Sequence, residues 1–235
     1  DEEHAGAGVQ ELMRSGVRAD SAVVAEPTLL NIVNAQKGVA RWVLETTGRA
    51  CHSSRPDDGV NAVYRMARVV AVLEEYADAL RGRPADPILG PRTLAVGRIA
   101  GGTSPNTVPD FCRIDIDRRL LPGETAAAAA ADLPAFLAAR LPADLHYTLT
   151  PSPAGCPALS PALSGELVQR LGAVIDSVVG KHAVQPVPFG TDAATVAQAG
   201  VPAVVFGPGD IAQAHTKDEW IDLAQLEPAA EILFR

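Results

Sequence analysis

The sequence predicts an α/β protein that is interrupted by an inserted α+β unit. Between about residues 37 and 152, the periodicity of apolar residues gives the order strand, helix, strand, strand, helix, strand. That order is typical of a split βαβ, or ferredoxin-like, layer of helices on one sheet. On both sides of this unit, short apolar strands alternate with helices. We therefore expect residues 1–36 and 153–235 to form the α/β domain and residues 37–152 to form the insertion.

The first α/β segment is predicted to deliver a carboxylate to the edge of a sheet. Residues 6–15 have the pattern of a short helix closed by Gly16, and residues 21–25 that of a buried strand. Glu26 follows this strand directly, and Pro27 cannot continue it. Because α/β sheets bind ligands at the carboxyl ends of their strands, the placement of Glu26 favours a functional role.

The inserted unit and the second α/β segment are predicted from their apolar periodicity. Residues 39–47 alternate like a half-buried antiparallel strand, and residues 60–80 form a long amphipathic helix that ends at Gly82. Further along the chain we expect strands at 93–99 and 111–120, a helix at 125–141, a strand at 145–150, a helix at 161–179, a short helix ending at Gly200, a strand at 203–206 and a helix at 227–235.

Composition excludes several classes of protein. Of the 235 residues, 47% are apolar and 20% are charged, which is ordinary for a globular protein, and the net charge of −8 without a basic stripe argues against a nucleic-acid partner. The longest apolar run, residues 126–131, is too short to span a bilayer, and we expect no membrane partner. Three cysteines without Cys-x-x-Cys spacing argue against a disulfide framework or a thiolate zinc site, which favours a cytoplasmic protein.

A group of carboxylates and histidines predicts a metal site. Glu2 and Glu3 are adjacent and precede a glycine-containing stretch, an arrangement that favours a bound cation, although a solvated acidic segment has the same pattern. Adding Glu26 and His215 favours zinc or a similar ion. Together with His52, these residues supply most of what a two-metal hydrolase needs. Taken alone, His215 is equally compatible with a loop histidine that only forms hydrogen bonds.

Seven blocks of sequence occur in a characteristic order over essentially the whole chain. They are Asp1-Glu2-Glu3, Glu26-Pro27-Thr28, residues 48–62 around His52, Gly101-Gly102 with Asn106, Asp117-Arg118-Arg119 with Pro122-Gly123, Gly190-Thr191-Asp192, and residues 207–219 around His215. Together they resemble the M20 metallopeptidase family. Residues 117–124 and 207–210 resemble its acetylornithine deacetylase and succinyl-diaminopimelate desuccinylase branch. The resemblance implies a zinc-peptidase-like catalytic domain with an inserted dimerisation or lid domain.

The same resemblance implies roles for the metal-site residues. Glu2 corresponds to the general base, Glu3 and His215 to ligands of one metal ion, and Glu26 to a ligand of the other. Two divalent ions are implied, zinc first, with cobalt or manganese also suited to oxygen and imidazole ligands. His52 corresponds to a residue that enters the active site of the other subunit of a homodimer built through residues 37–152. The alternative for His52 is an ordinary turn histidine.

Other matched positions suggest how a substrate is held. Asn106 and Arg119 correspond to donors for a substrate carboxylate, and Arg118 is expected on the opposite side of its strand. Gly190 and Thr191 correspond to the loop that lines the substrate pocket, although a capped helix entry explains them equally well. Glu219 is expected either to orient His215 through a hydrogen bond or to be solvated.

One element of the family pattern precedes the point where this sequence begins. Family members carry an earlier His-x-Asp pair, so we expect this chain to be part of a longer enzyme and to be impaired on its own. The predicted function is metal-dependent hydrolysis of N-acyl amino acids, by a deacetylase or desuccinylase. A carboxypeptidase or aminoacylase acting on short peptides is the alternative within the enzymes. A metal-free binding relative without catalysis, or a regulatory dimerisation module formed by residues 37–152, is the alternative outside them.

Overall fold

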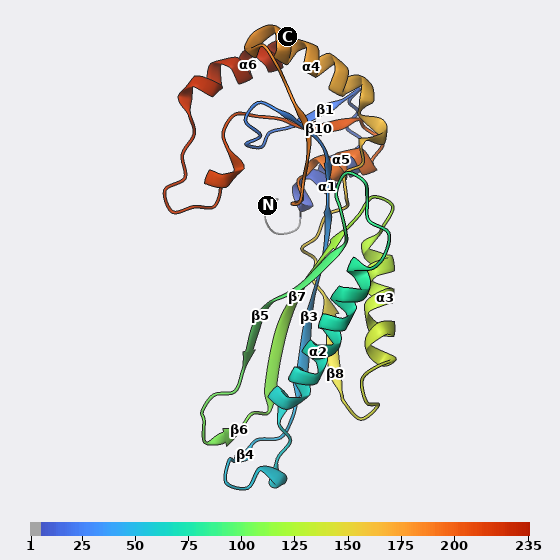
Figure 1. Cartoon of the computed structure of the whole chain (residues 1–235), viewed down its shortest axis with the longest axis vertical. Helices are drawn as coiled ribbons and strands as arrows, with labels where there is room; N and C mark the ends of the chain where they lie inside the picture. The colour runs from blue at the N-terminus through green and yellow to red at the C-terminus, as the bar shows by residue number, and fades with distance from the viewer. Residues whose placement is uncertain (1–5) are drawn as a thin grey trace.

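The computed structural model describes residues 6–235 and contains two separate four-stranded sheets, placed one beyond the other along the long axis of the molecule (Figure 1). One sheet is built from the two ends of the sequence, and the other from the predicted insertion. The α/β fold class and the ferredoxin-like insertion are confirmed. The boundaries chosen for the three sequence segments remain a prediction.

The first sheet has helices on both faces. Its strand order is β1 (Ala22–Val24), β10 (Ala203–Val205), β2 (Ile32–Gln36) and β9 (Val184–Val187). On one face, α4 (Gly165–Val179) and α6 (Leu226–Phe234) bury a cluster around Ile32 and Phe206. On the other face, α1 (Ala7–Arg14) and α5 (Ala193–Gln198) lie beside a cluster around Val33 and Val205. These two layers place the carboxyl ends of β1 and β10 side by side, because the two strands are parallel.

Two details of this sheet differ from the sequence prediction. The strand expected at residues 21–25 is shorter and is not buried, because β1 forms an edge of the described sheet and Val23 is exposed. Strands β2 and β9 were not predicted at all. β2 is buried on both faces, so it lacks the alternation from which a strand is recognised.

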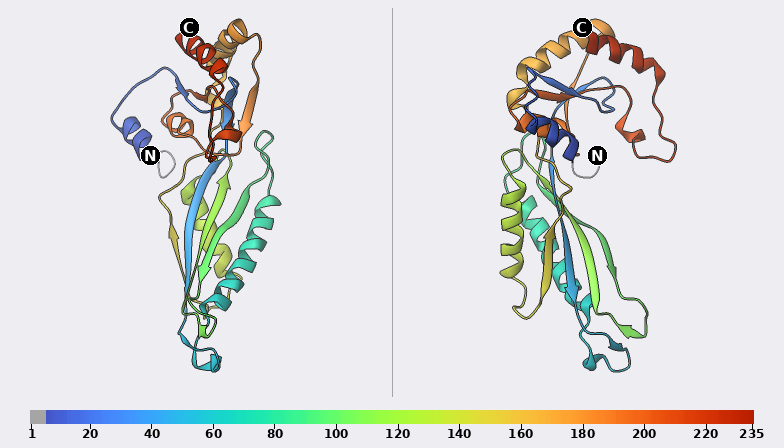
Figure 2. Two further views of the ribbon diagram at one scale, coloured as in Figure 1. Left: turned by 90° about the vertical axis from the view of Figure 1, so that its left-hand side faces the viewer. Right: turned by 180° about the vertical axis from the view of Figure 1, so that it is seen from behind.

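The second sheet is entirely antiparallel and has helices on one face only. Its order is β5 (Thr93–Gly101), β7 (Phe111–Leu120), β3 (Gly38–Thr47) and β8 (Tyr147–Pro151), which is the order of a split βαβ unit. Helices α2 (Ala62–Arg81) and α3 (Ala126–Ala138) cover the face that carries Trp42 and Leu44 (Figure 2). The opposite face carries charged side chains instead. Asn61 and Thr125 cap the two helices by accepting hydrogen bonds from backbone amides.

Short elements complete the described chain. A two-stranded ribbon of β4 (Cys51–His52) and β6 (Thr107–Val108) lies at the end of the second unit that is farthest from the first sheet (Figure 1). Single 3₁₀ turns lie at Pro56–Asp58, Pro161–Leu163, Ile211–Gln213 and Leu223–Gln225. Among residues 6–235, no helix combines the length and the apolar character that crossing a membrane requires.

Two chain segments connect the units, and they pair with each other. The first runs through Gln36, Lys37 and Gly38 from β2 into β3, and the second returns from β8 through Cys156 and Leu159. Val39 exchanges backbone hydrogen bonds with Cys156 at 2.8 and 3.2 Å, and Gln36 does the same with Leu159 at 3.2 and 3.1 Å. A Cβ atom on Gly38 would lie 2.6 Å from a backbone nitrogen of the returning segment, so the two strands approach closely only because residue 38 is glycine.

A buried charge network fixes the helices of the second unit to its sheet. Arg118 is 2% exposed and lies on the helix side of β7, as expected from strand alternation. Its guanidinium group pairs with Glu124 at 3.0 Å and with Asp132 at 3.3 Å, and it donates to the hydroxyl of Tyr76 at 2.5 Å. Burial raises the pKa of Glu124, but the Leu121 amide, Arg92 and Arg118 lower it more, and the net pKa lies below its usual value. The network therefore holds an ionised carboxylate beside a buried cation.

Candidate active site

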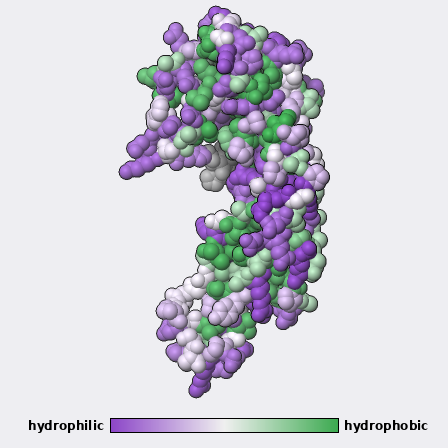
Figure 3. Space-filling model, viewed as in Figure 1, coloured by the Kyte–Doolittle hydropathy of each residue, from purple (hydrophilic) through white to green (hydrophobic). Residues whose placement is uncertain are grey.

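A cavity of about 460 Å³ opens where the two units meet. The space-filling view shows the molecule hollowed at this junction (Figure 3). Both units and both connecting segments contribute to its walls, so the cavity exists only because the chain leaves the first sheet and returns to it. Its lining includes five of the predicted site residues: Glu26, Arg119, Gly190, Thr191 and His215.

Glu26 reaches this cavity because the loop after β1 is attached to the loop after β10. The hydroxyl of Thr28 accepts the Gly207 amide at 3.0 Å and donates to the Asn31 carbonyl at 2.7 Å. The amides of Leu29 and Leu30, both left-handed at φ 54° and 59°, donate to the carbonyls of the 207–209 turn at 2.7 and 3.0 Å. Left-handed leucine costs free energy, which these hydrogen bonds offset. The loops that follow the two strands are therefore held together, and they place Glu26 and His215 near each other.

His215 lies in the loop that continues from the same turn. Its backbone is left-handed at φ 61°, a conformation that histidine adopts more readily than most residues. The side chain lines the junction cavity together with Glu26. The prediction that these two residues approach each other is thus supported by the geometry, although they come from the opposite ends of the chain.

The structure describes only part of the predicted metal site. Glu2 and Glu3 lie outside the described residues. Within residues 6–235, no group of three or more His, Cys, Asp or Glu side chains is placed closely enough to hold a metal ion. Glu26 and His215 each have an interaction partner. A carboxylate and an imidazole are nevertheless ligand types that zinc, cobalt and manganese accept. Glu26 and His215 are therefore chemically suited to the expected ion, but two side chains alone do not make a complete metal site.

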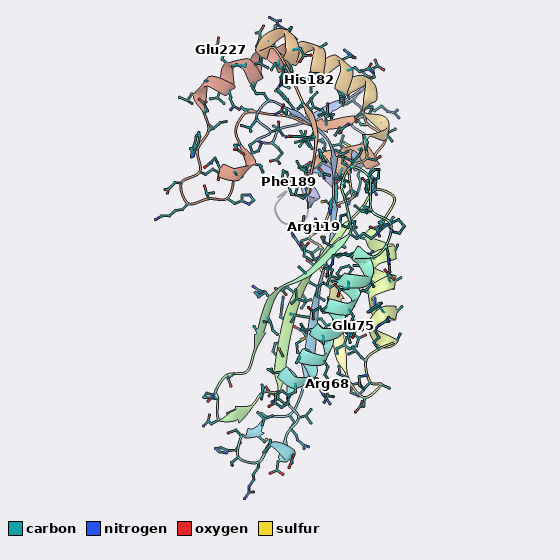
Figure 4. The ribbon with its side chains drawn as sticks, viewed as in Figure 1. Arg68, Glu75, Arg119, His182, Phe189 and Glu227 are labelled. Atoms are coloured by element: carbon teal, nitrogen blue, oxygen red, sulfur yellow. The ribbon has the colours of Figure 1, made fainter. Side chains whose placement is uncertain are left out.

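The second unit and the loop after β9 form the wall opposite Glu26. Arg119 and Phe189 lie close together at the junction (Figure 4). The Arg119 Nε donates to Asp117 at 2.7 Å, and its Nη1 lies 3.5 Å from the Pro188 carbonyl. A Cβ atom on Gly190 would lie 2.1 Å from the Cys156 sulfur, so a larger residue here would force the Cys156 side chain to move. Burial raises the pKa of the Cys156 thiol, which keeps it protonated near neutral pH.

Thr191 lines the cavity, but its hydroxyl group is already in use. The side chain is 2% exposed and donates to Gln36 at 2.7 Å. The predicted capping of the following helix, α5, is weak. The Thr191 hydroxyl accepts one hydrogen bond from the Ala193 amide at 3.3 Å, and the side chain of Asp192 makes no capping hydrogen bond. The role of Thr191 in binding a substrate therefore stays a prediction, and only its backbone and methyl group remain to line the cavity.

His52 and Asn106 lie together at the far end of the second unit, away from the cavity. His52 on β4 pairs with Thr107 on β6, and the Ser53 amide donates to the Asn106 carbonyl at 3.0 Å. Both side chains are exposed. Within one chain the predicted site residues therefore form two groups, and His52 does not join Glu26 and His215.

Glu219 lines a neighbouring cavity of about 410 Å³, which shares Glu26 and Ala214 with the first. Trp220 and Pro208 are among the other residues of this cavity. The expectation that Glu219 orients His215 stays a prediction.

Sequence reasoning missed several residues that shape the junction cavity. In the sequence, Arg41 is only one residue of an alternating strand. The structure places it in the cavity lining and opposite Asp117 of β7, a pairing that can be recognised only when the strand register is known. Gln36 was not singled out, and only its pairing with Thr191 shows its importance. Asp192 was noted as a helix entry, and the structure places it in the cavity wall.

Comparison with known proteins assigns this chain to a family. Residues 34–145 match the family model described as a peptidase dimerisation domain of the M20 type. Over 99% of its length the chain is 34% identical to the acetylornithine deacetylase of Proteus mirabilis strain HI4320, and over its whole length it is 32% identical to that of Myxococcus xanthus. The chain belongs to the M20 metallopeptidase family. The recognition made from the sequence blocks is confirmed.

Solved structures of other proteins show the same fold. The aminopeptidase PepT from Bacillus cereus ATCC 10987 superposes over 99% of this chain with a TM-score of 0.72 at 23% identity. The M20 metallo-carboxypeptidase Sso-CP2 from Sulfolobus solfataricus superposes over 97% with a TM-score of 0.73 at 16% identity. At these identities the likeness concerns the fold alone. The chain spans 60% and 62% of the two deacetylases and 60% and 64% of the two solved chains.

Proposed function

We propose that this protein, as an M20 member, is a metal-dependent amidohydrolase that cleaves N-acyl amino acids in the manner of a deacetylase or desuccinylase. The observation that carries the proposal is the meeting of Glu26 and His215 in one cavity whose other wall presents Arg119. This arrangement puts metal-binding donor types and a carboxylate-binding cation on opposite sides of one space. An N-acyl amino acid needs both, because its amide must be polarised while its carboxylate is held. The curated relatives named acetylornithine deacetylases support the same class of reaction.

Each residue has a defined task in this proposal. Glu3 and His215 hold one divalent ion and Glu26 holds the other, with zinc as the first choice and cobalt or manganese as alternatives. Such ions polarise a carbonyl group and activate water when they are bound. Glu2 accepts the proton of the attacking water and returns it to the departing amine. Arg119 holds the α-carboxylate and so orients the amide bond.

His52 requires a second subunit to take part. Its position at the tip of the second unit, far from the cavity of its own chain, supports the proposal that it acts in the partner's cavity within a homodimer formed through residues 37–152. Asn106 shares this tip through the hydrogen bond from Ser53, so it would enter the partner's cavity together with His52. Strand β5 is an edge strand of the sheet within residues 6–235, so its outer backbone groups could pair with a second copy.

The test is hydrolysis by the full-length protein in the presence and absence of metal. After removal of metal with a chelator, we expect that adding zinc, cobalt or manganese restores release of the free amine from N-acetyl and N-succinyl amino acids. His215→Ala and Glu26→Ala are expected to lower kcat/KM by at least about 100-fold, since each removes a metal ligand. His146→Ala, which alters a histidine outside the cavity lining, is the matched control. Metal binding without any amide hydrolysis would instead identify a non-catalytic relative.

A further inference from the structure

The face of the second sheet that lacks helices carries a regular series of charges. Side chains alternate between the faces of a strand, so the residues that alternate with the buried Trp42 and Leu44 of β3 and Ile114 and Ile116 of β7 point away from the helices. The charged residues among them and on β5 form ion pairs, three of them between strands and two within β7. These pairs are Arg41 with Asp117 at 2.9 Å, Arg119 with Asp117 at 2.7 Å, Arg98 with Asp115 at 2.7 Å, Arg113 with Asp115 at 3.2 Å, and Arg113 with Glu45 at 3.9 Å.

At the cavity end of this series, the carboxylate of Asp117 accepts hydrogen bonds from two guanidinium groups, those of Arg41 and Arg119. Arg119 uses its Nε on one oxygen of Asp117, and Arg41 uses its Nε on the other. A single negative charge cannot neutralise two positive charges, so this trio retains one net positive charge. Both arginines, but not Asp117, line the junction cavity. The unbalanced charge is therefore presented to the space where a substrate would lie.

The terminal nitrogens of Arg41 are available to a ligand. Only its Nε is engaged by another residue of the described chain, and 40% of the side chain is exposed. A guanidinium group in this orientation presents two parallel N–H groups, the geometry that binds a carboxylate in a bidentate manner. Glu26 and Asp192 also line the cavity, but within residues 6–235 the ion pair of Arg41 is with Asp117.

The register of the sheet places Arg41 farther from the first unit than Arg119. β3 leaves the connecting segment at Gly38, and Val39 is opposite Arg119, whereas Arg41 is opposite Asp117. Arg41 is thus two residues farther along the strand, roughly 7 Å at the usual rise per residue. If Arg119 holds the α-carboxylate next to the amide, the next position along the amino-acid part of the substrate lies toward Arg41.

We propose that Arg41 is a second anion-binding residue of this cavity and that it selects amides whose amino-acid part carries a side-chain carboxylate. The inference rests on the proposed hydrolytic function and specifies its substrate class as N-acylated dicarboxylic amino acids. A guanidinium at this position disfavours a cationic side chain, because the two like charges would share a partly desolvated space. A carboxylate there would complete the charge balance that Asp117 leaves open.

Binding to metal-free protein tests the inference without requiring turnover. The probes are N-acetylglutamate and N-acetylglutamine, which differ only in the side-chain carboxylate. By calorimetry we expect the wild-type protein to bind N-acetylglutamate about tenfold more tightly, the lower range for one hydrogen-bonded charge pair. Arg41→Gln is expected to abolish this preference while leaving the affinity for N-acetylglutamine unchanged, and Arg41→Lys to retain part of it. Equal affinities of the wild-type protein for the two probes would overturn the proposal.

Two further measurements separate this proposal from its alternatives. Arg98→Gln is the matched control, since Arg98 lies on the same sheet face and is paired with Asp115 but does not line the cavity, and we expect it to keep the preference. In metal-loaded protein, the same preference should appear in kcat/KM. Hydrolysis of both compounds at rates that Arg41→Gln reduces equally would show that Arg41 shares the α-carboxylate with Arg119, and would refute a second carboxylate site. Absence of all hydrolysis would refute the proposed function, while the binding measurement would still decide the role of Arg41.

Discussion

Gln36 and Thr191 are joined by two buried hydrogen bonds that run in opposite directions. The Thr191 hydroxyl donates to Gln36 Oε1 at 2.7 Å, and Gln36 Nε2 donates to the Thr191 carbonyl at 3.1 Å. Gln36 ends β2 immediately before the segment that leads into the second unit, and Thr191 belongs to the loop of the cavity wall. The pair therefore links the connecting segment to the cavity, and it spans 155 residues of sequence.

Replacing Gln36 by leucine is expected to destabilise this junction. The substitution keeps the volume but removes the acceptor of the buried Thr191 hydroxyl and one of the donors to the Thr191 carbonyl, which costs about 1–3 kcal/mol in the free energy of unfolding. Urea denaturation measures the loss. In the double variant with Thr191→Val the hydroxyl is gone as well, so we expect the two losses to be less than additive. Strict additivity would mean that the two side chains do not interact.

Gly207→Ala is expected to displace Glu26. A Cβ atom at residue 207 would lie 2.7 Å from the backbone oxygen of Glu26, and a clash with a backbone atom cannot be relieved by rotating a side chain. We expect a loss of roughly 1–3 kcal/mol in stability from overpacking, together with weaker metal binding by the full-length protein, measured by titration with zinc. Gly97→Ala is the control, because a Cβ atom there meets nothing within 4 Å. Unchanged zinc affinity in Gly207→Ala would show that Glu26 does not depend on this contact.

The sequence was sufficient for elements whose apolar pattern is regular. β7 begins and ends where the alternation from Phe111 to Leu120 predicts, and α2 follows its amphipathic stripe to within two residues. β2 and β9 were missed because their burial depends on pairing with each other and with β10, which no local pattern reports. Local sequence also could not show that the Thr191 hydroxyl donates a hydrogen bond to Gln36, since this contact exists only after the chain returns to the first sheet.

The candidate site was predictable in composition but not in arrangement. The sequence blocks named Glu26, His215 and Arg119, and the structure places all three at one cavity. It also places His52 and Asn106 far from them, a separation that the order of residues along the chain does not reveal. Arg41 was not predicted as a site residue, because its proposed role depends on the register between β3 and β7, in which Arg41 is opposite Asp117.

Ser54 is expected to fix the orientation and tautomer of His52. The Ser54 backbone amide donates to His52 Nδ1 at 3.2 Å, and the Ser54 hydroxyl lies 2.7 Å from the same atom. A backbone amide can only donate, so Nδ1 accepts and the neutral ring carries its proton on Nε2. This leaves an N–H donor directed outward, as polarising a carbonyl requires. We predict that ring ¹⁵N shifts measured by NMR will show the Nε2–H tautomer.

Removing the Ser54 hydroxyl tests this arrangement in catalysis. In Ser54→Ala we expect kcat to fall by up to about tenfold with KM and thermal stability unchanged, because one of two orienting bonds is lost and the fold is not affected. Ser54→Thr, which retains a hydroxyl, is expected to recover most of the activity. Ser53→Ala serves as the neighbouring control, since no hydrogen bond of the Ser53 side chain is found in residues 6–235. Equal losses in Ser53→Ala and Ser54→Ala would rule out a specific role for Ser54.

The last prediction concerns the pH dependence of the second unit. Glu124 accepts from Arg118 at 3.0 Å, from Arg92 at 2.9 Å and from the Leu121 amide at 2.9 Å. Burial alone raises the pKa of Glu124, but the Leu121 amide, Arg92 and Arg118 lower it more. The net pKa in the folded protein is therefore below the ordinary value of 4.5. A group with a lowered folded pKa stabilises the fold above its unfolded pKa, and this contribution is lost as the pH falls through the folded pKa.

Glu124→Gln is therefore expected to be destabilised by roughly 2 kcal/mol at pH 7, because Arg118 keeps Asp132 and Tyr76 but loses one charged partner. The difference from the wild-type protein should shrink as the pH is lowered below 4.5, when the wild-type carboxylate becomes protonated as well. Urea denaturation at a series of pH values measures both effects. Glu75→Gln, whose side chain is 62% exposed and pairs with Arg140 at 3.4 Å, is expected to change stability by less than about 0.5 kcal/mol at any pH. A Glu124→Gln deficit that stays constant down to pH 3 would show that the network is held by packing and hydrogen bonding rather than by the charge of Glu124.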